Sequence, residues 1–142
     1  MVDGRTRVCG ILANPVEHTL SPVLHNTLAQ ELGHSLIYVP FKPEKAGLDI
    51  AVKGAFALNI LGLNVSVPYK QEVMKSLAAV DSDAEQIGAV NTLVRTESGY
   101  KGYNTDYLGL WRALQEEGIR LDGQEVIVFG AGGAAKAVVY LC

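Results

Sequence analysis

A glycine-rich turn between a strand-like run and a helix-like run restricts the fold of this chain more than any other segment. Residues 125–129 read EVIVF, and Gly130, Ala131, Gly132, Gly133, Ala134 and Ala135 follow directly. These six residues match G-x-G-x-x-A, in which glycines permit a tight turn and let a pyrophosphate approach the N–H groups at a helix N-terminus. The segment predicts the first strand, turn and helix of a dinucleotide-binding Rossmann domain.

The position of this turn limits what it can bind. Only seven residues follow Ala135 in the 142-residue sequence. A βαβ unit needs about 30 residues, and the residue that reads the ribose lies about 20 residues beyond the glycines. We therefore expect an incomplete nucleotide site, and we expect the sequence to be the N-terminal part of a longer enzyme.

Charge and composition exclude several classes of protein. With 12 basic and 15 acidic side chains the net charge is -3, which argues against a nucleic-acid or anionic-membrane partner. Hydrophobic residues make up 49%, enough for a folded core. We find neither a signal peptide nor a membrane-spanning run and expect a cytoplasmic protein. Cys9 and Cys142 lie far apart without metal-ligand spacing, so no metal site and no disulfide are expected.

Strand-like and helix-like runs alternate along the chain. Strands are expected at residues 7–13, 36–41, 61–67, 90–95 and 100–103. Helices are expected at residues 21–33, 42–59, 69–80, 81–87 and 106–117. A turn at residues 97–99 joins the last two strands as a hairpin. The alternation predicts a three-layer α/β/α domain with a mainly parallel sheet and one antiparallel strand, followed by the truncated start of a Rossmann domain.

The same pattern gives expected domain boundaries. We assign residues 1–105 to a substrate-binding and catalytic domain. A connecting helix is expected at residues 106–120, because its apolar positions share one face and Gly118 follows them. Residues 121–142 are then the incomplete start of the nucleotide-binding domain.

Polar residues collect where the predicted strands end or helices begin. They are Thr19, Ser21, Ser66, Lys70, Asn91, Thr105 and Asp106. Because the carboxyl ends of parallel strands line one rim of a sheet, we expect these side chains to lie near one another. The ammonium of Lys70 and the carboxylate of Asp106 make a candidate acid/base pair there. The hydroxyls at 19, 21 and 66 and the amide at 91 suit a polyhydroxylated, carboxylated small molecule.

Each of these residues also has a purely structural interpretation. Ser21 and Thr105 can cap helices, and Asp106 in a first helical turn meets the helix dipole favourably. Lys70, taken alone, is typical of a solvated surface lysine. Their expected placement together at one rim is what favours a catalytic or binding role over these structural ones.

Five separated motifs cover nearly the whole chain. They are NP at 14–15 with HTLSP at 18–22 and HN at 25–26, NVSVPYK at 64–70, GAVNT at 88–92, GYNTD at 102–106 and GAGGAA at 130–135. In their order and spacing they make the chain similar to the shikimate dehydrogenases. That resemblance implies an N-terminal catalytic α/β domain, joined to a Rossmann domain across a cleft that closes.

The resemblance also implies an activity and residue roles. The reaction would be the reversible reduction of 3-dehydroshikimate to shikimate by NADPH, in the pathway to chorismate and the aromatic amino acids. Lys70 would be the acid/base lysine and Asp106 its partner, both touching substrate hydroxyls. Asn91 and Ser66 would bind ring hydroxyls, and Thr19 with Ser21 would hold the carboxylate. Residues 130–135 would meet the pyrophosphate of NADP.

Several alternatives stay open at the level of the sequence. Position 19 is threonine where the family more often has serine, and position 66 is serine where it usually has threonine. Threonine at position 19 also occurs in quinate-using relatives, so a quinate/shikimate dehydrogenase is one alternative. An isolated shikimate-binding domain without turnover is another. The choice between NADP and NAD and the oligomeric state are also open.

Overall fold

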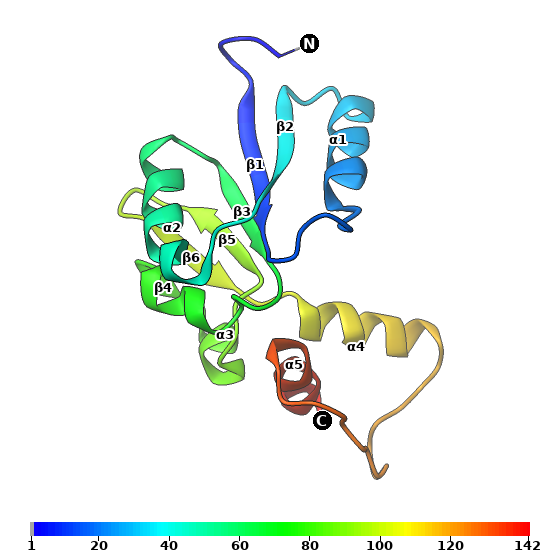
Figure 1. Ribbon diagram of the computed structural model, residues 1–142. Coiled ribbons are helices and arrows are strands. Elements are labelled where there is room, and N and C mark those ends of the chain that lie inside the picture. The colour runs from blue at the N-terminus through cyan, green and yellow to red at the C-terminus, as the bar shows by residue number, and fades with distance from the viewer. Residues whose placement is uncertain (1) are drawn as a thin grey trace.

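The computed structural model describes residues 2–142 as an α/β structure around one six-stranded sheet (Figure 1). The strands are β1 (Arg7–Leu12), β2 (Leu36–Phe41), β3 (Gly62–Val65), β4 (Ala79–Val80), β5 (Thr92–Arg95) and β6 (Tyr100–Tyr103). The α-helices are α1 (Ser21–Glu31), α2 (Leu48–Ala57), α3 (Ser82–Ile87), α4 (Asp106–Glu116) and α5 (Gly133–Leu141). Two short 3-10 helices are η1 (Lys45–Gly47) and η2 (Glu72–Ser76).

The strand order is β2-β1-β3-β5-β6-β4. Parallel pairing joins β1 to β2 and β3, and it joins β4 to β6. Only β5, of the strands in residues 2–142, runs antiparallel to its neighbours, which are β3 and β6. The expected mainly parallel sheet with one antiparallel strand from the hairpin is therefore confirmed. The carboxyl ends of β1, β3 and β6 lie at the same edge as a result.

The main core lies between α2 and one face of the sheet. On α2, Leu48, Val52 and Ala55 are buried at helical spacing, whereas on β3 Leu63 and Val65 are buried at strand spacing. All five belong to one cluster of packed apolar side chains. The spacing on each element places its apolar side chains on a single face, and the two faces bury each other.

Helix α1 lies on the β2 side of the sheet, away from α2 (Figure 1). The side chain of Asn26 donates to the carbonyl of Tyr38 at 2.9 Å and accepts from its N–H at 2.8 Å. The rings of His25 and Tyr38 stack at 4.2 Å. These contacts pair the outer edge of β2 with a side chain, which blocks it from pairing with another strand.

The helices α3, α4 and α5 form a second group near the carboxyl end of β6 (Figure 1). Ile87 and Ala89, at the end of α3, bury against Ala137 of α5. Tyr107 of α4 and Tyr140 of α5 pack against this small cluster. The helix that follows the glycine turn is therefore packed directly against the end of α3.

The predicted helix at residues 69–80 is wrong. Only η2 is helical there, and the chain continues into β4, which pairs with β6. The N–H of Ala78 donates to Tyr100 at 3.0 Å, and the N–H of Asp81 donates to Gly102 at 2.9 Å. The free edge of β6 satisfies these backbone groups, and this tertiary pairing prevails over the helical pattern.

The predicted strand at residues 125–129 is also wrong. This segment belongs to none of the pairings in the sheet that residues 2–142 form. Ile127 is 80% exposed and Phe129 is 93% exposed. A strand requires a neighbour for its N–H and C=O groups, and no neighbour lies beside this apolar run within the described residues.

The predicted helix caps need correction. Ser21 is the first residue of α1 and not its cap, and its N–H donates to the hydroxyl of Thr19 at 3.2 Å. Thr105 occupies the cap position of α4, but its side chain makes no capping bond. The carboxamide oxygen of Asn104 instead accepts from the N–H of Asp106 at 2.9 Å.

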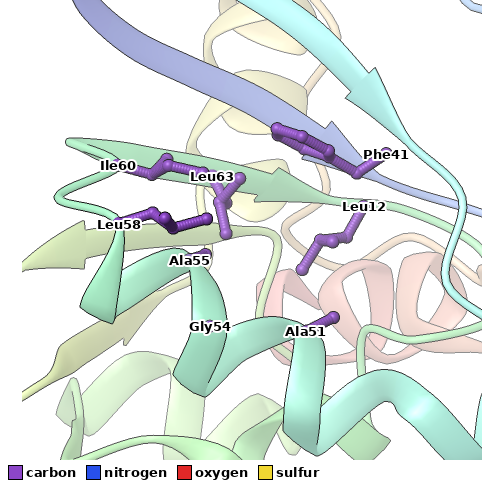
Figure 2. Close-up of a pocket in the computed structure, with 8 residues that line it drawn as sticks. All are labelled: Leu12, Phe41, Ala51, Gly54, Ala55, Leu58, Ile60 and Leu63. Atoms are coloured by element: carbon purple, nitrogen blue, oxygen red, sulfur yellow. The ribbon is translucent and has the colours of Figure 1, made fainter.

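An apolar cavity of about 260 Å³ lies between α2 and the sheet (Figure 2). It is lined by Leu12, Phe41, Ala51, Gly54, Ala55, Leu58, Ile60 and Leu63. Its lining is apolar throughout, so it offers no polar group to orient a hydroxylated ligand. A Cβ added at Gly54 would meet no atom within 4 Å.

Gly54→Ala is therefore expected to raise the free energy of unfolding by about 1 kcal/mol, because alanine is the better residue in a helix interior. The added methyl group enters open space and strains nothing. Urea denaturation followed by circular dichroism measures the change. A lower free energy of unfolding would contradict the room that the structure shows at this position.

Candidate active site

Loops meet at the edge where β1, β3 and β6 end. The loop after β1 bonds to the loop after β3, since the N–H of Asn14 donates to Val67 at 3.1 Å. The loop after β3 bonds in turn to the segment before β5, since the N–H of Val90 donates to Lys70 at 2.7 Å. Backbone hydrogen bonds therefore fix the rim from which the polar side chains project.

Lys70 and Asp106 form an ion pair at this rim. The distance from Nζ of Lys70 to Oδ2 of Asp106 is 2.6 Å. Their side chains are 17% and 31% exposed, so the pair is shielded from bulk water and still accessible. A charge-assisted bond of this length is strong, and it leaves two further ammonium protons for a ligand oxygen.

Asn91 holds the carboxylate of Asp106, and Asn104 holds its backbone N–H. The amide of Asn91 donates to Oδ1 of Asp106 at 2.8 Å, which leaves Oδ2 for the lysine. Asn104 is 5% exposed; it accepts from the N–H of Asp106 and donates to Ala89 at 3.0 Å. Sequence reasoning misses Asn104. The available signal was its residue type, typical of helix caps, two positions before Asp106.

The amide of Asn91 also links β5 to α4. It donates to the hydroxyl of Thr105 at 2.9 Å and accepts from the N–H of Thr105 at 3.0 Å. The hydroxyl of Thr92 donates to the same amide oxygen at 2.9 Å. Asn91 is thus oriented by several bonds, and a ligand that binds it must replace one of them.

A second polar group lies near the start of α1. Thr19 and Ser21 are joined by the bond between the Thr19 hydroxyl and the Ser21 N–H, at 3.2 Å. Tyr38 donates to Oδ1 of Asn64 at 2.8 Å. Burial raises the pKa of Tyr38 to about 12, although a hydrogen bond with the Ser21 side chain opposes this, so the phenol stays a donor at neutral pH.

Asn64 joins the two polar groups. Its amide makes long contacts of 3.4 Å to the hydroxyl of Thr92 and 3.5 Å to the carbonyl of Asn91. Ser66 follows two residues later, half-buried, with its carbonyl accepting from Tyr69 at 2.9 Å. Sequence reasoning gives Asn64 no role, although it lies in the same motif as Ser66 and Lys70. Hydrogen bonds therefore run from Tyr38 through Asn64 and Asn91 to Asp106 of the ion pair, and this series does not include the hydroxyl of Ser66.

The glycine turn leaves the N-terminus of α5 open. Gly132 is the N-cap, and no side chain caps the helix. Gly130 adopts a positive φ of 120°, which glycine allows. A Cβ added at Gly130 or Gly132 would meet no atom within 4 Å. Free N–H groups beside open space fit the pyrophosphate of a dinucleotide.

Asp83 of α3 binds a tyrosine from each of the two following helices. Tyr140 of α5 donates to Oδ1 of Asp83 at 3.1 Å, and Tyr107 of α4 donates to Oδ2. The hydrogen bond to Asp83 is the main reason why the pKa of Tyr107 rises to about 12. The bond from Tyr140 fastens the far end of α5 to α3.

No group of three or more His, Cys, Asp or Glu side chains within residues 2–142 is arranged to hold a metal ion. No helix in this part of the chain has the length and apolar character needed to cross a membrane.

A family model described as "Shikimate dehydrogenase substrate binding domain" matches residues 11–93, more than half of the chain. The chain belongs to the shikimate dehydrogenase family. It is 46% identical over 140 residues to the shikimate dehydrogenase (NADP(+)) of Pyrococcus furiosus. It is 48% identical over 139 residues to that of Desulforamulus reducens.

The family fold is shared in three dimensions. A crystal structure of a shikimate dehydrogenase in complex with NADP+ matches 99% of this chain with a TM-score of 0.93 at 42% identity. The shikimate 5-dehydrogenase of Listeria monocytogenes, in complex with shikimate and NAD, matches 96% with a TM-score of 0.88 at 39% identity.

The chain spans about half the length of the relatives that it matches. It covers 51% of the Pyrococcus furiosus protein and 47% of the Desulforamulus reducens protein. It covers 49% and 47% of the two crystallised chains. The similarity therefore concerns the substrate-binding domain and the glycine turn.

Proposed function

We propose that this chain supplies the substrate-binding and acid/base half of an NADP-dependent shikimate dehydrogenase, which interconverts 3-dehydroshikimate and shikimate. The observation that carries the proposal is the ion pair of Lys70 and Asp106, 2.6 Å apart, in which Lys70 lies within the residues that match the family's substrate-binding domain. The lysine has protons to give to a carbonyl oxygen that becomes a hydroxyl, and the aspartate orients and balances it.

The other polar residues suit the remaining groups of such a substrate. Asn91 and Ser66 are proposed to bind ring hydroxyls, and Thr19 with Ser21 is proposed to bind the carboxylate. Hydroxyl and amide groups can donate or accept as each ring hydroxyl requires. The support for Asn91 is its bond to Asp106, and the support for Ser66 is its place two residues after Asn64, which contacts Asn91. Thr19 and Ser21 are supported by their common position at the start of α1.

Residues 130–135 are proposed to hold the pyrophosphate of NADP at the start of α5. A bound nicotinamide cofactor would supply the hydride. The residues of this chain bind the phosphates and keep a proton at Nζ of Lys70. The relatives named NADP(+)-dependent and the open, uncapped helix N-terminus support this choice of cofactor.

The same reasoning gives the remaining proposals. Residues 1–105 act as the catalytic domain, 106–120 as the connecting helix, and 121–142 as the start of the cofactor domain. The partner is a small molecule and not a nucleic acid, in keeping with the net charge of -3. We place the protein in the cytoplasm, where enzymes of this kind of metabolism work on soluble substrates.

Titration calorimetry on the chain tests the substrate. Saturable binding of shikimate is expected, and Asp106→Asn should weaken it about tenfold, because a charged hydrogen-bond partner is lost. Asp122→Asn is the matched control, since Asp122 is exposed in a distant turn. Tighter binding of quinate would redirect the proposal to a quinate-using enzyme. Equal effects of the two substitutions would refute the assigned site.

A further inference from the structure

Gly133 lies against the stem of Lys70. A Cβ added at Gly133 would stand 3.0 Å from Cβ and 3.0 Å from Cδ of Lys70, and 3.4 Å from Cβ of Ala89. At 3.0 Å two carbons are well inside their ordinary contact distance. The absence of a side chain at position 133 is therefore what allows α5 to approach the lysine so closely.

Neither the backbone nor the nucleotide pattern demands glycine at this position. The glycines with positive φ include Gly130, but Gly133 is not among them. The pattern G-x-G-x-x-A uses positions 130, 132 and 135, so position 133 is one of its variable places. A steric requirement at Lys70 explains the third glycine, whereas cofactor binding does not.

We propose that Gly133 is a positioning residue, which sets the stem of Lys70 so that its ammonium meets Asp106. The contact links the cofactor-binding turn to Lys70, because the N-terminal end of α5 both follows that turn and touches the stem of the lysine. The catalytic meaning of this coupling depends on the function proposed for Lys70. The steric contact between Gly133 and Lys70 does not depend on that function.

The surrounding contacts prevent α5 from moving away. Ala137 is 2% exposed and buried in the small cluster that includes Ala89. At the far end, Tyr140 donates to Asp83 at 3.1 Å. Since the helix is held at Ala137 and Tyr140 and the lysine stem is flexible, an added methyl group should displace Lys70 and leave α5 in place.

Nuclear magnetic resonance of the chain labelled with ¹³C-lysine measures this displacement without substrate or cofactor. The Cε signal of Lys70 is assigned from its loss in Lys70→Arg. In Gly133→Ala this signal should shift, while those of Lys42, Lys53 and Lys75 stay in place. Gly109→Ala is the matched control, because a Cβ there meets no atom within 4 Å. It should leave the Lys70 signal unchanged.

A second variant distinguishes displacement of the Lys70 side chain from general damage to the fold. Tyr140→Phe removes the hydroxyl that fastens α5, so in the Gly133→Ala background it should return the Lys70 signal toward its original position. An unchanged Lys70 signal in Gly133→Ala would overturn the proposal. Failure of Gly133→Ala to fold would also overturn the proposal. If the side chain of Lys70 simply moves aside, the added methyl group should not unfold the protein. Failure to bind shikimate would refute the proposed function and leave this result untouched.

Discussion

Lys70→Met is expected to lower turnover about 10²-fold or more in any preparation of the protein that oxidises shikimate with NADP⁺. Methionine keeps much of the length of the side chain that packs beside Gly133 and removes the ammonium that meets Asp106 at 2.6 Å. The rate of NADPH formation, followed by absorbance, gives the measurement. The loss should fall on the maximal rate and not only on the Michaelis constant, since a proton-bearing group acts in the chemical step.

Lys75→Met is the matched control for this substitution. Lys75 lies in η2, exposed to solvent, five residues along the chain. Its replacement makes the same chemical change away from the rim, so turnover should stay close to that of the unaltered protein. A normal rate for Lys70→Met would remove Lys70 from the acid/base role. A similar loss of turnover in both variants would show that the removal of a positive charge causes it, and not the position of Lys70.

Gly10→Ala is expected to lower the free energy of unfolding by about 3 kcal/mol or more. Gly10 lies in β1 and pairs with Val39 of β2 and Leu63 of β3. An added Cβ would stand 2.4 Å from the carbonyl oxygen of Val39 and 2.5 Å from the ring of Phe41. A backbone oxygen in a parallel ladder cannot yield without loss of the pairing.

Urea denaturation compares this variant with Gly54→Ala, which makes the same change where there is room. The two substitutions should move the free energy of unfolding in opposite directions. A Gly10→Ala variant as stable as the original chain would show that β1 and β2 lie farther apart than in this structure.

The sequence predicts the elements whose partners are near in the chain or whose apolar pattern is unambiguous. The hairpin of β5 and β6 and the parallel strands around β1 follow from strand runs and turn residues. The errors have a common cause. Residues 69–80 have a helical pattern, but the edge of β6 pairs with β4. Residues 125–129 have a strand pattern, but no described strand lies beside them.

The candidate site shows the same division. Residue type and place at strand ends single out Lys70, Asp106 and Asn91, because ionisable and amide groups at a sheet rim are suited to chemistry. This reasoning does not single out Asn104, because its role depends on its burial and on its hydrogen bonds to Ala89 and Asp106. The role of Thr105 is likewise decided by its bond to Asn91 and not by the helix that it precedes.

The amino-acid sequence by itself determined the fold class, the family motifs and the chemical types available at the rim, since these depend on local periodicity and residue identity. The tertiary structure alone decided which groups meet. It paired Asn91 with Asp106, fastened α5 to Asp83, and brought Gly133 so close that an added Cβ would stand 3.0 Å from the side chain of Lys70. Such contacts join residues far apart in the chain, and only close packing of the folded backbone fixes their distances.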